Sequence, residues 1–182
     1  LLNMLPASIA DRLKSGQSTI ADDFENASVL FADLVGFTEL ASSQPPSQTV
    51  DMLNGIFSAF DQAVAARGLE KIKTIGDAYM VASGVPTPRD DHVAEMLGLS
   101  RDMLALLRRH NEDKGTNLQL RIGLSCGPLI AGVIGSKKFI YDIWGDTVNV
   151  ASRMESTGVS GRVQVTEAVV QAAGPTFTFE DR

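Results

Sequence analysis

Cysteine is almost absent from this sequence, and neither a long apolar run nor an excess of positive charge is present. The only cysteine, Cys126, has no partner for an internal disulfide, which fits a reducing compartment. We expect Cys126 to be a small buried residue of the core. The longest apolar stretches, such as residues 130–134, fall far short of the roughly 20 residues that a membrane-spanning helix needs. The net charge of −6 argues against a nucleic-acid-binding surface, so no nucleic-acid partner is expected.

The composition is that of one folded domain with a short N-terminal appendage. At 182 residues and 44% hydrophobic content, the chain can bury one substantial core but not two large ones. We expect residues 1–26 to form an amphipathic helix and a polar linker, and residues 27–182 to form the main domain. The helical stripe is narrow, so we expect it to pair with its counterpart in a second subunit; it consists of Leu2, Leu5, Ile9 and Leu13.

The order of the predicted elements indicates the fold class. Alternating apolar patterns predict a strand, a helix, a two-stranded hairpin, a second helix and a further strand, at residues 27–34, 47–66, 69–81, 90–111 and 118–125. This order is the split βαβ arrangement, so we predict an α+β fold with a ferredoxin-like core and a mostly antiparallel sheet. Later candidates are a helix at 146–155 and strands at 129–134, 139–143, 163–165 and 177–179.

Two aspartates are candidates for a metal site. In the split βαβ topology the first strand lies beside the third, so Asp33 should meet Asp77 in the hairpin turn. Paired carboxylates suit Mg²⁺ ions that also bind substrate phosphates, and the backbone N–H groups of Gly36, Phe37 and Thr38 could contact a phosphate. The alternative is that Asp33 caps a helix and Asp77 is an ordinary turn residue. Polymerase palm domains and diguanylate cyclases place carboxylates similarly, so this pattern indicates phosphoryl transfer and no more.

Three longer motifs carry a resemblance to a known family. FADLVGFTEL at 31–40, EKIKTIGDAYM at 70–80 and YDIWGDTVNVASRME at 141–155 resemble, in this order, the signatures of class III nucleotidyl cyclases. The resemblance implies the nucleotide cyclase fold. It also implies that Asp33, Asp77 and the backbone carbonyl of Leu34 bind two Mg²⁺ or Mn²⁺ ions per active site.

The resemblance assigns base recognition to Lys73 and Asp142. Adenine offers an acceptor at N1 and an amino donor at N6, so a Lys and an Asp suit adenine and mismatch guanine. Related guanylyl cyclases typically carry Glu and Cys at these two places, so the chain resembles an adenylyl cyclase acting on ATP; a guanylyl cyclase is the alternative. Strand alternation puts Lys71 on the same face as Lys73, so spacing alone does not separate them.

Three further residues are expected to contact the nucleotide. Asn149 and Arg153 are four residues apart and therefore share one face of the predicted helix. By resemblance, Asn149 orients the ribose, Arg153 binds the reacting phosphate and Arg121 contacts the distal phosphates. Without the motifs, Arg153 would be interpreted as a solvated helix residue and Arg121 as an ordinary strand or loop cation.

The resemblance also implies partners. It is strongest to bacterial homodimeric cyclases such as the membrane-anchored mycobacterial type, in which each site is shared between subunits. We therefore expect a homodimer that forms the cytoplasmic domain of a longer parent, with an upstream sensor or a plasma-membrane anchor. Family members generally continue into a hairpin with a triphosphate-binding Lys, and the sequence ends at Arg182 without it. A non-catalytic nucleotide-binding or dimerisation module is therefore the remaining alternative.

Overall fold

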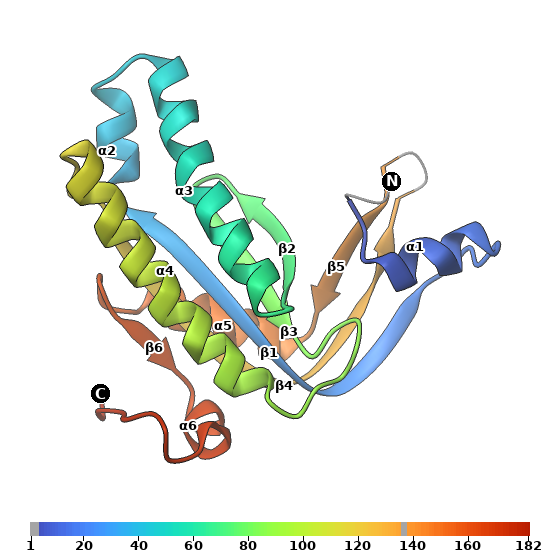
Figure 1. The fold of residues 1–182 in the computed structure, drawn as a ribbon. Coiled ribbons are helices and arrows are strands. Elements are labelled where there is room, and N and C mark those ends of the chain that lie inside the picture. The colour runs from blue at the N-terminus through green and yellow to red at the C-terminus, as the bar shows by residue number, and fades with distance from the viewer. Residues whose placement is uncertain (1–3, 136–137) are drawn as a thin grey trace.

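The fold is a single curved sheet with helices on both faces. The computed structural model describes residues 4–135 and 138–182 (Figure 1). Helices α3 (Pro46–Ala66) and α4 (His92–Lys114) cover one face of the sheet, and α1 (Ala7–Lys14) and α5 (Asp146–Ser156) pack against the other. Two short helices complete the structure, α2 (Phe37–Ser42) and α6 (Glu167–Ala173).

The sheet confirms the predicted split βαβ topology. Its strand order is β2-β3-β1-β4-β5, with every neighbouring pair antiparallel, and β6 pairs in parallel with β4. The first strand therefore lies beside the third, as expected. The strands are β1 (Ala21–Val35), β2 (Glu70–Ile75), β3 (Ala78–Ser83), β4 (Gln119–Ile134), β5 (Ile140–Trp144) and β6 (Val163–Val165).

Side-chain alternation along the strands divides the core in two. On β1, Leu30 and Leu34 face α3 and α4, whereas Val29 faces α1 and α5. An aromatic cluster anchors the first core, where the Tyr79 ring lies 5.2 Å from Phe57 and 5.6 Å from Phe60 between centroids. The middle of the sheet is therefore buried on both faces, whereas β2 and the paired ends of β4 and β5 keep exposed or partly exposed side chains.

The N-terminal strand and the strand after α4 are longer than predicted. β1 begins at Ala21, inside the expected linker, and the strands predicted at 118–125 and 129–134 are the single strand β4. A β-bulge in β1 between Phe24 and Ala27 lies opposite Pro128, so this proline does not interrupt the ladder. The structure has no strand at 177–179, and sequence patterns missed α6, which Thr166 caps through the Val169 backbone N–H.

The N-terminal helix packs on its own domain. Leu5 and Ile9 are buried with the sheet residues of the second core, and Arg12 donates two hydrogen bonds of 2.5 and 2.9 Å to Asp22 of β1. The expected pairing of this stripe with a second subunit is therefore wrong, because its apolar side chains are already covered; Leu2 lies outside the described residues. Within residues 4–135 and 138–182, no helix has the length and hydropathy needed to cross a bilayer.

Candidate functional site

The two predicted metal ligands meet at one end of the sheet. Asp33 lies near the end of β1 opposite Ala78 of β3, and Asp77 is in the turn that precedes β3. The Leu34 backbone N–H donates to the Asp77 carbonyl at 3.4 Å, so the predicted proximity is confirmed. Burial raises the pKa of Asp33 above its ordinary value; the negative charges of Asp77 and Glu155 add to this, and Arg121 opposes it.

This arrangement fits a divalent cation. Two carboxylates that repel each other in a partly buried place are stabilised by a positive ion. Among the described residues, no group of three or more His, Cys, Asp or Glu side chains could hold a metal by itself. An ion at Asp33 and Asp77 would therefore take other ligands from backbone, water or substrate oxygens, as Mg²⁺ commonly does. Gly36, at a φ of +87°, turns the chain into α2 directly after β1.

Arg121 links this carboxylate pair to helix α5. It lies on β4 opposite Asp33, and its Nη2 is 3.4 Å from Asp33 Oδ2. Its Nε donates to Glu155 Oε1 on α5 at 2.7 Å. Glu155 was not singled out in the sequence, although one signal was available: it lies four residues after the buried Ala151, and a carboxylate on the packed face of a helix requires a partner.

Lys73 on β2 and Asp142 on β5 form an ion pair between the first and last strands of the sheet order. Lys73 Nζ lies 2.6 Å from Asp142 Oδ2, and the Asp142 side chain is only 13% exposed. The other carboxylate oxygen accepts from the Ile143 backbone N–H at 2.9 Å. β2 and β5 are far apart in strand order, so curvature of the sheet brings them into contact. The residues predicted to recognise the base are thus brought together.

The expectation that Lys71 and Lys73 share a face is wrong. A β-bulge in β2 separates them, because Lys71 is opposite Val81 whereas Lys73 is opposite the next residue along, Met80. Lys71 Nζ lies 2.7 Å from Asp61 of α3, and 5.0 Å from the centroid of the Tyr79 ring. The bulge therefore directs only Lys73 towards Asp142.

Helix α5 presents Asn149 and Arg153 to solvent. Val148 and Ala151 are buried against the sheet, as the helical pattern predicts, and both candidate side chains are exposed. Arg153 is 66% exposed and has only a distant contact, 3.7 Å from its Nη2 to Asp146 Oδ1. Such an exposed cation is available to a group from outside the chain.

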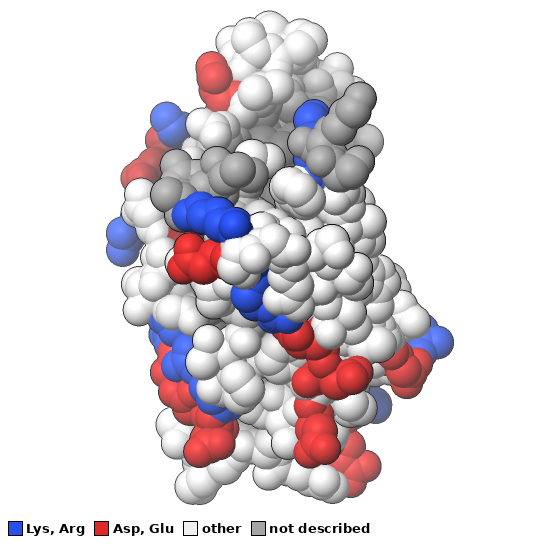
Figure 2. Space-filling model, turned by 90° about the vertical axis from the view of Figure 1, so that its right-hand side faces the viewer, with Lys and Arg blue, Asp and Glu red and all other residues white. Residues whose placement is uncertain are grey.

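Exposed apolar side chains flank Asp142. Ile130 of β4 is opposite Trp144, and Ile134 is opposite Ile140, and all four are exposed. Figure 2 views the molecule from the side on which α1 and β5 lie and shows broad uncharged areas between scattered charges. Cross-strand apolar pairs left open in this way are typical of a protein interface.

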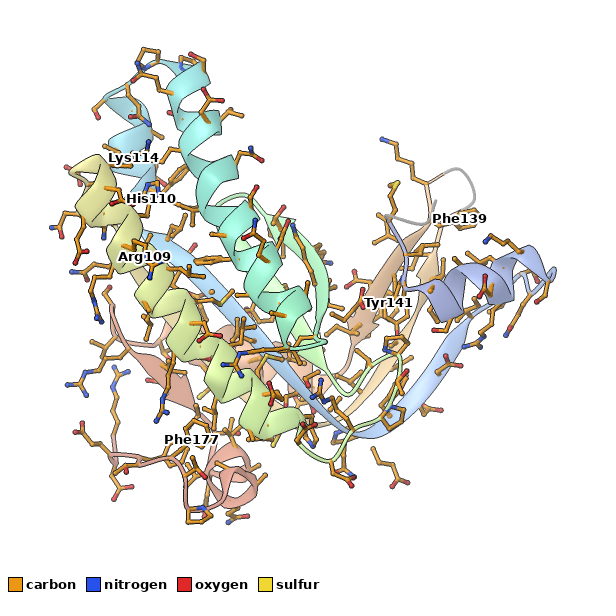
Figure 3. The ribbon with its side chains drawn as sticks, in the orientation of Figure 1. Arg109, His110, Lys114, Phe139, Tyr141 and Phe177 are labelled. Atoms are coloured by element: carbon orange, nitrogen blue, oxygen red, sulfur yellow. The ribbon has the colours of Figure 1, made fainter. Side chains whose placement is uncertain are left out.

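Three other side chains that could carry chemistry, His92, His110 and Tyr141, lie outside the groups described above. His110 is near the end of α4 that carries Lys114, far along the helix from β5 in Figure 3. His92 Nδ1 is hydrogen-bonded to the buried Ser28 hydroxyl at 2.6 Å. Tyr141, the residue before Asp142, is buried in the core that α1 covers (Figure 3). The hydrogen bond to Ser28 gives His92 a structural role, whereas His110 Nε2 and the Tyr141 hydroxyl are buried without a hydrogen-bond partner among the described residues.

Comparisons with known proteins support one family. The profile described as "Adenylate and Guanylate cyclase catalytic domain" matches residues 20–182. An adenylate cyclase of Mycobacterium tuberculosis is 51% identical over the whole chain, which spans 41% of that protein. Retinal guanylyl cyclase 1 of Mus musculus is 42% identical over the whole chain, which spans 17% of its length. The solved catalytic core of a rhodopsin-guanylyl cyclase with converted specificity, in complex with ATPalphaS, is 33% identical, with a TM-score of 0.82 over 87% of this chain and 86% of that one.

Proposed function

Because this chain belongs to the adenylate and guanylate cyclase catalytic domain family, we propose that it converts ATP to 3′,5′-cyclic AMP and pyrophosphate. The observation that carries this proposal is the Lys73–Asp142 pair, held at 2.6 Å across the curled sheet. The ammonium group can donate to adenine N1, and the carboxylate can accept from the N6 amino group. Guanine presents a donor and an acceptor in the opposite order, so the same pair disfavours it.

The proposed reaction closes a ring within the nucleotide. The ribose 3′ hydroxyl gives its proton to water or to an aspartate of the metal site, and its oxygen attacks the α-phosphorus. The bond from that phosphorus to the β-phosphate oxygen breaks, and pyrophosphate leaves. Two Mg²⁺ or Mn²⁺ ions, held by Asp33, Asp77 and the Leu34 carbonyl, would supply Lewis-acid activation of the 3′-OH and neutralise phosphate charge.

The other site residues position the nucleotide. Asn149 holds the ribose, and Arg153 offsets charge that develops on the α-phosphate, a contribution of about 3–4 kcal/mol for a single well-placed donor. Arg121 and the backbone N–H groups of Gly36, Phe37 and Thr38 contact the remaining phosphates in this proposal. Solvent exposure of Asn149 and Arg153 supports a contact with a ligand brought from outside the chain.

We assign each active site to two subunits of a homodimer. Among the described residues, no hydrogen bond or ion pair joins Asp33, Asp77 and Arg121 to the Lys73–Asp142 pair, which supports two half-sites in each chain. An isologous dimer would complete two sites from these halves, and the exposed apolar pairs beside Asp142 offer it a surface. The chain spans less than half of its mycobacterial relative, so a membrane or sensor segment in a longer cytoplasmic-facing parent belongs to the proposal as well.

A nucleotide assay tests this function. With Mg²⁺ or Mn²⁺, we expect the chain to form cyclic AMP from ATP and to use GTP at least tenfold less well, since a mismatched polar edge leaves buried groups unpaired. The similarity to a guanylyl cyclase makes GTP the informative competitor. Preferred formation of cyclic GMP would identify a guanylyl cyclase, and nucleotide binding without turnover would identify a non-catalytic module.

Exchanging the base-recognising pair should shift this preference. In Lys73→Glu with Asp142→Cys, the donor and acceptor pattern is altered, so we expect the ratio of kcat/KM for ATP over GTP to fall by about 100-fold. Lys71→Glu is the matched control: it changes the same charge on the same strand but faces Asp61, so the ratio should stay as in the parent. An unchanged ratio in the double variant would mean that the base is recognised elsewhere.

A further inference from the structure

We propose that Glu155 is a positioning residue that keeps the Arg121 guanidinium off Asp33, so that the carboxylate pair remains available to a divalent cation. This inference rests on the proposed metal site at Asp33 and Asp77. Glu155 lies outside that site, on helix α5, and the inference assigns it a role in the affinity of the site for a cation.

The geometry around Arg121 is unequal. Arg121 Nε is 2.7 Å from Glu155 Oε1, the length of a strong charge-assisted hydrogen bond, whereas Nη2 is 3.4 Å from Asp33 Oδ2, near the limit of an interaction. The side chains are 12% exposed for Glu155, 24% for Asp33 and 27% for Arg121. The most enclosed carboxylate therefore holds the guanidinium, and the metal-ligand candidate is only its secondary partner.

The backbone fixes this arrangement. Helix α5 lies so close to β4 that a Cβ at Gly123 would be 2.0 Å from the Glu155 backbone nitrogen. Gly158 leaves space for the Arg121 stem on the other side, since a Cβ there would lie 3.3 Å from Arg121 Cγ. These close approaches hold the Glu155 backbone against β4, beside the Arg121 stem.

Removing the Glu155 charge should redirect Arg121. A partly buried guanidinium without its main partner is costly, and the other carboxylate that it already contacts is Asp33, directly opposite on β1. An Arg–carboxylate pair at Asp33 would then compete with a cation for the same oxygens. Glu155 therefore matters to the metal site through Arg121 and without touching the metal.

The test measures cation binding without nucleotide or turnover. Titration of the whole chain with Mn²⁺ alone, followed by electron paramagnetic resonance of the free ion, should show a dissociation constant about tenfold higher in Glu155→Gln than in the parent. Glu112→Gln, an exposed change of the same charge on α4, should bind Mn²⁺ like the parent. Adding Arg121→Met to Glu155→Gln removes the competitor and should restore parental affinity, which a merely structural role for Glu155 would not do.

The outcomes separate this inference from the function it rests on. Glu155→Gln that binds Mn²⁺ as tightly as the parent, or a weakened affinity that Arg121→Met fails to restore, overturns the role of Glu155 and leaves the cyclase assignment intact. A parent chain that binds no Mn²⁺ and forms no cyclic AMP overturns both. Thermal melts of every variant identify any that fails to fold, and Glu155→Asp, which keeps the charge, then serves as the second variant and should bind Mn²⁺ more tightly than Glu155→Gln.

Discussion

Asp33→Asn is expected to lower cyclic AMP formation by roughly a thousandfold or more while leaving the fold intact. The reason is that the neutral amide keeps the shape of Asp33 but loses the charge that attracts a cation. Asp77→Asn should have a comparable effect, because the two carboxylates share one ion-binding place at the end of β1 and the β2–β3 turn. Turnover and the thermal melt are measured on the same preparations.

The difference in stability between Asp33→Asn and the parent should depend on pH in a defined direction. The pKa of Asp33 is raised by burial and by neighbouring negative charge, so the folded chain retains a proton that the unfolded chain releases. Stability of the parent therefore falls as the pH rises from the ordinary Asp value, near 3.8, through the raised one. Above that window the ionised Asp33 destabilises the metal-free fold, and the amide does not.

Melting in the presence of a chelator checks this sign. We expect Asp33→Asn to melt no lower than the parent at pH 7, and its advantage over the parent to be larger at pH 7 than at pH 4.5. Asp51→Asn, an exposed change on α3, is the control and should keep both activity and melting temperature. Full activity in a well-folded Asp33→Asn chain would disprove the metal assignment.

A mixture of two inactive variants should regain activity. If Asp33 and Lys73 of one chain serve different sites, a heterodimer of Asp33→Ala with Lys73→Ala collects both lesions in one site and leaves the other intact. Random pairing makes about half of the dimers heterodimers, each with one working site of two, so the mixture should reach roughly a quarter of parental activity. Each variant alone should be nearly inactive.

Subunit exchange decides how the result is interpreted. Exchange is followed by tagging one variant and recovering the untagged one with it, and activity is measured over the same period. A mixture of Asp33→Ala with Asp77→Ala is the matched control, since both lesions lie in the same half-site and no intact site can form. An exchanged mixture of Asp33→Ala with Lys73→Ala that remains inactive would show that each site lies within one chain.

The sequence by itself was sufficient for the topology and for the relative placement of several candidate site residues. Apolar periodicity and turn residues follow local backbone geometry, so the order of elements predicted the split βαβ core and the meeting of Asp33 with Asp77. The same local rules predicted that Asn149 and Arg153 share an exposed face of α5. Lys73 and Asp142 came from motif resemblance, and the structure brings them to 2.6 Å.

Other features depended on contacts between segments distant in the sequence. The polar residues at the start of β1 resemble a linker and become a strand only because β4 offers them a ladder. The bulge that separates Lys71 from Lys73 arises from pairing with β3, which strand alternation cannot foresee. The apolar stripe of α1 packs against the sheet of its own chain, and the second core covers it there.

Glu155 illustrates the same division. The helical pattern of the sequence places Glu155 on α5. Its pairing with Arg121, 34 residues away along the chain, forms only because the helix crosses β4 at Gly123. Local propensity therefore determined which elements form and which side chains they carry. Tertiary packing decided which charges meet, because the free energy of a buried charge depends on partners that only the folded chain supplies.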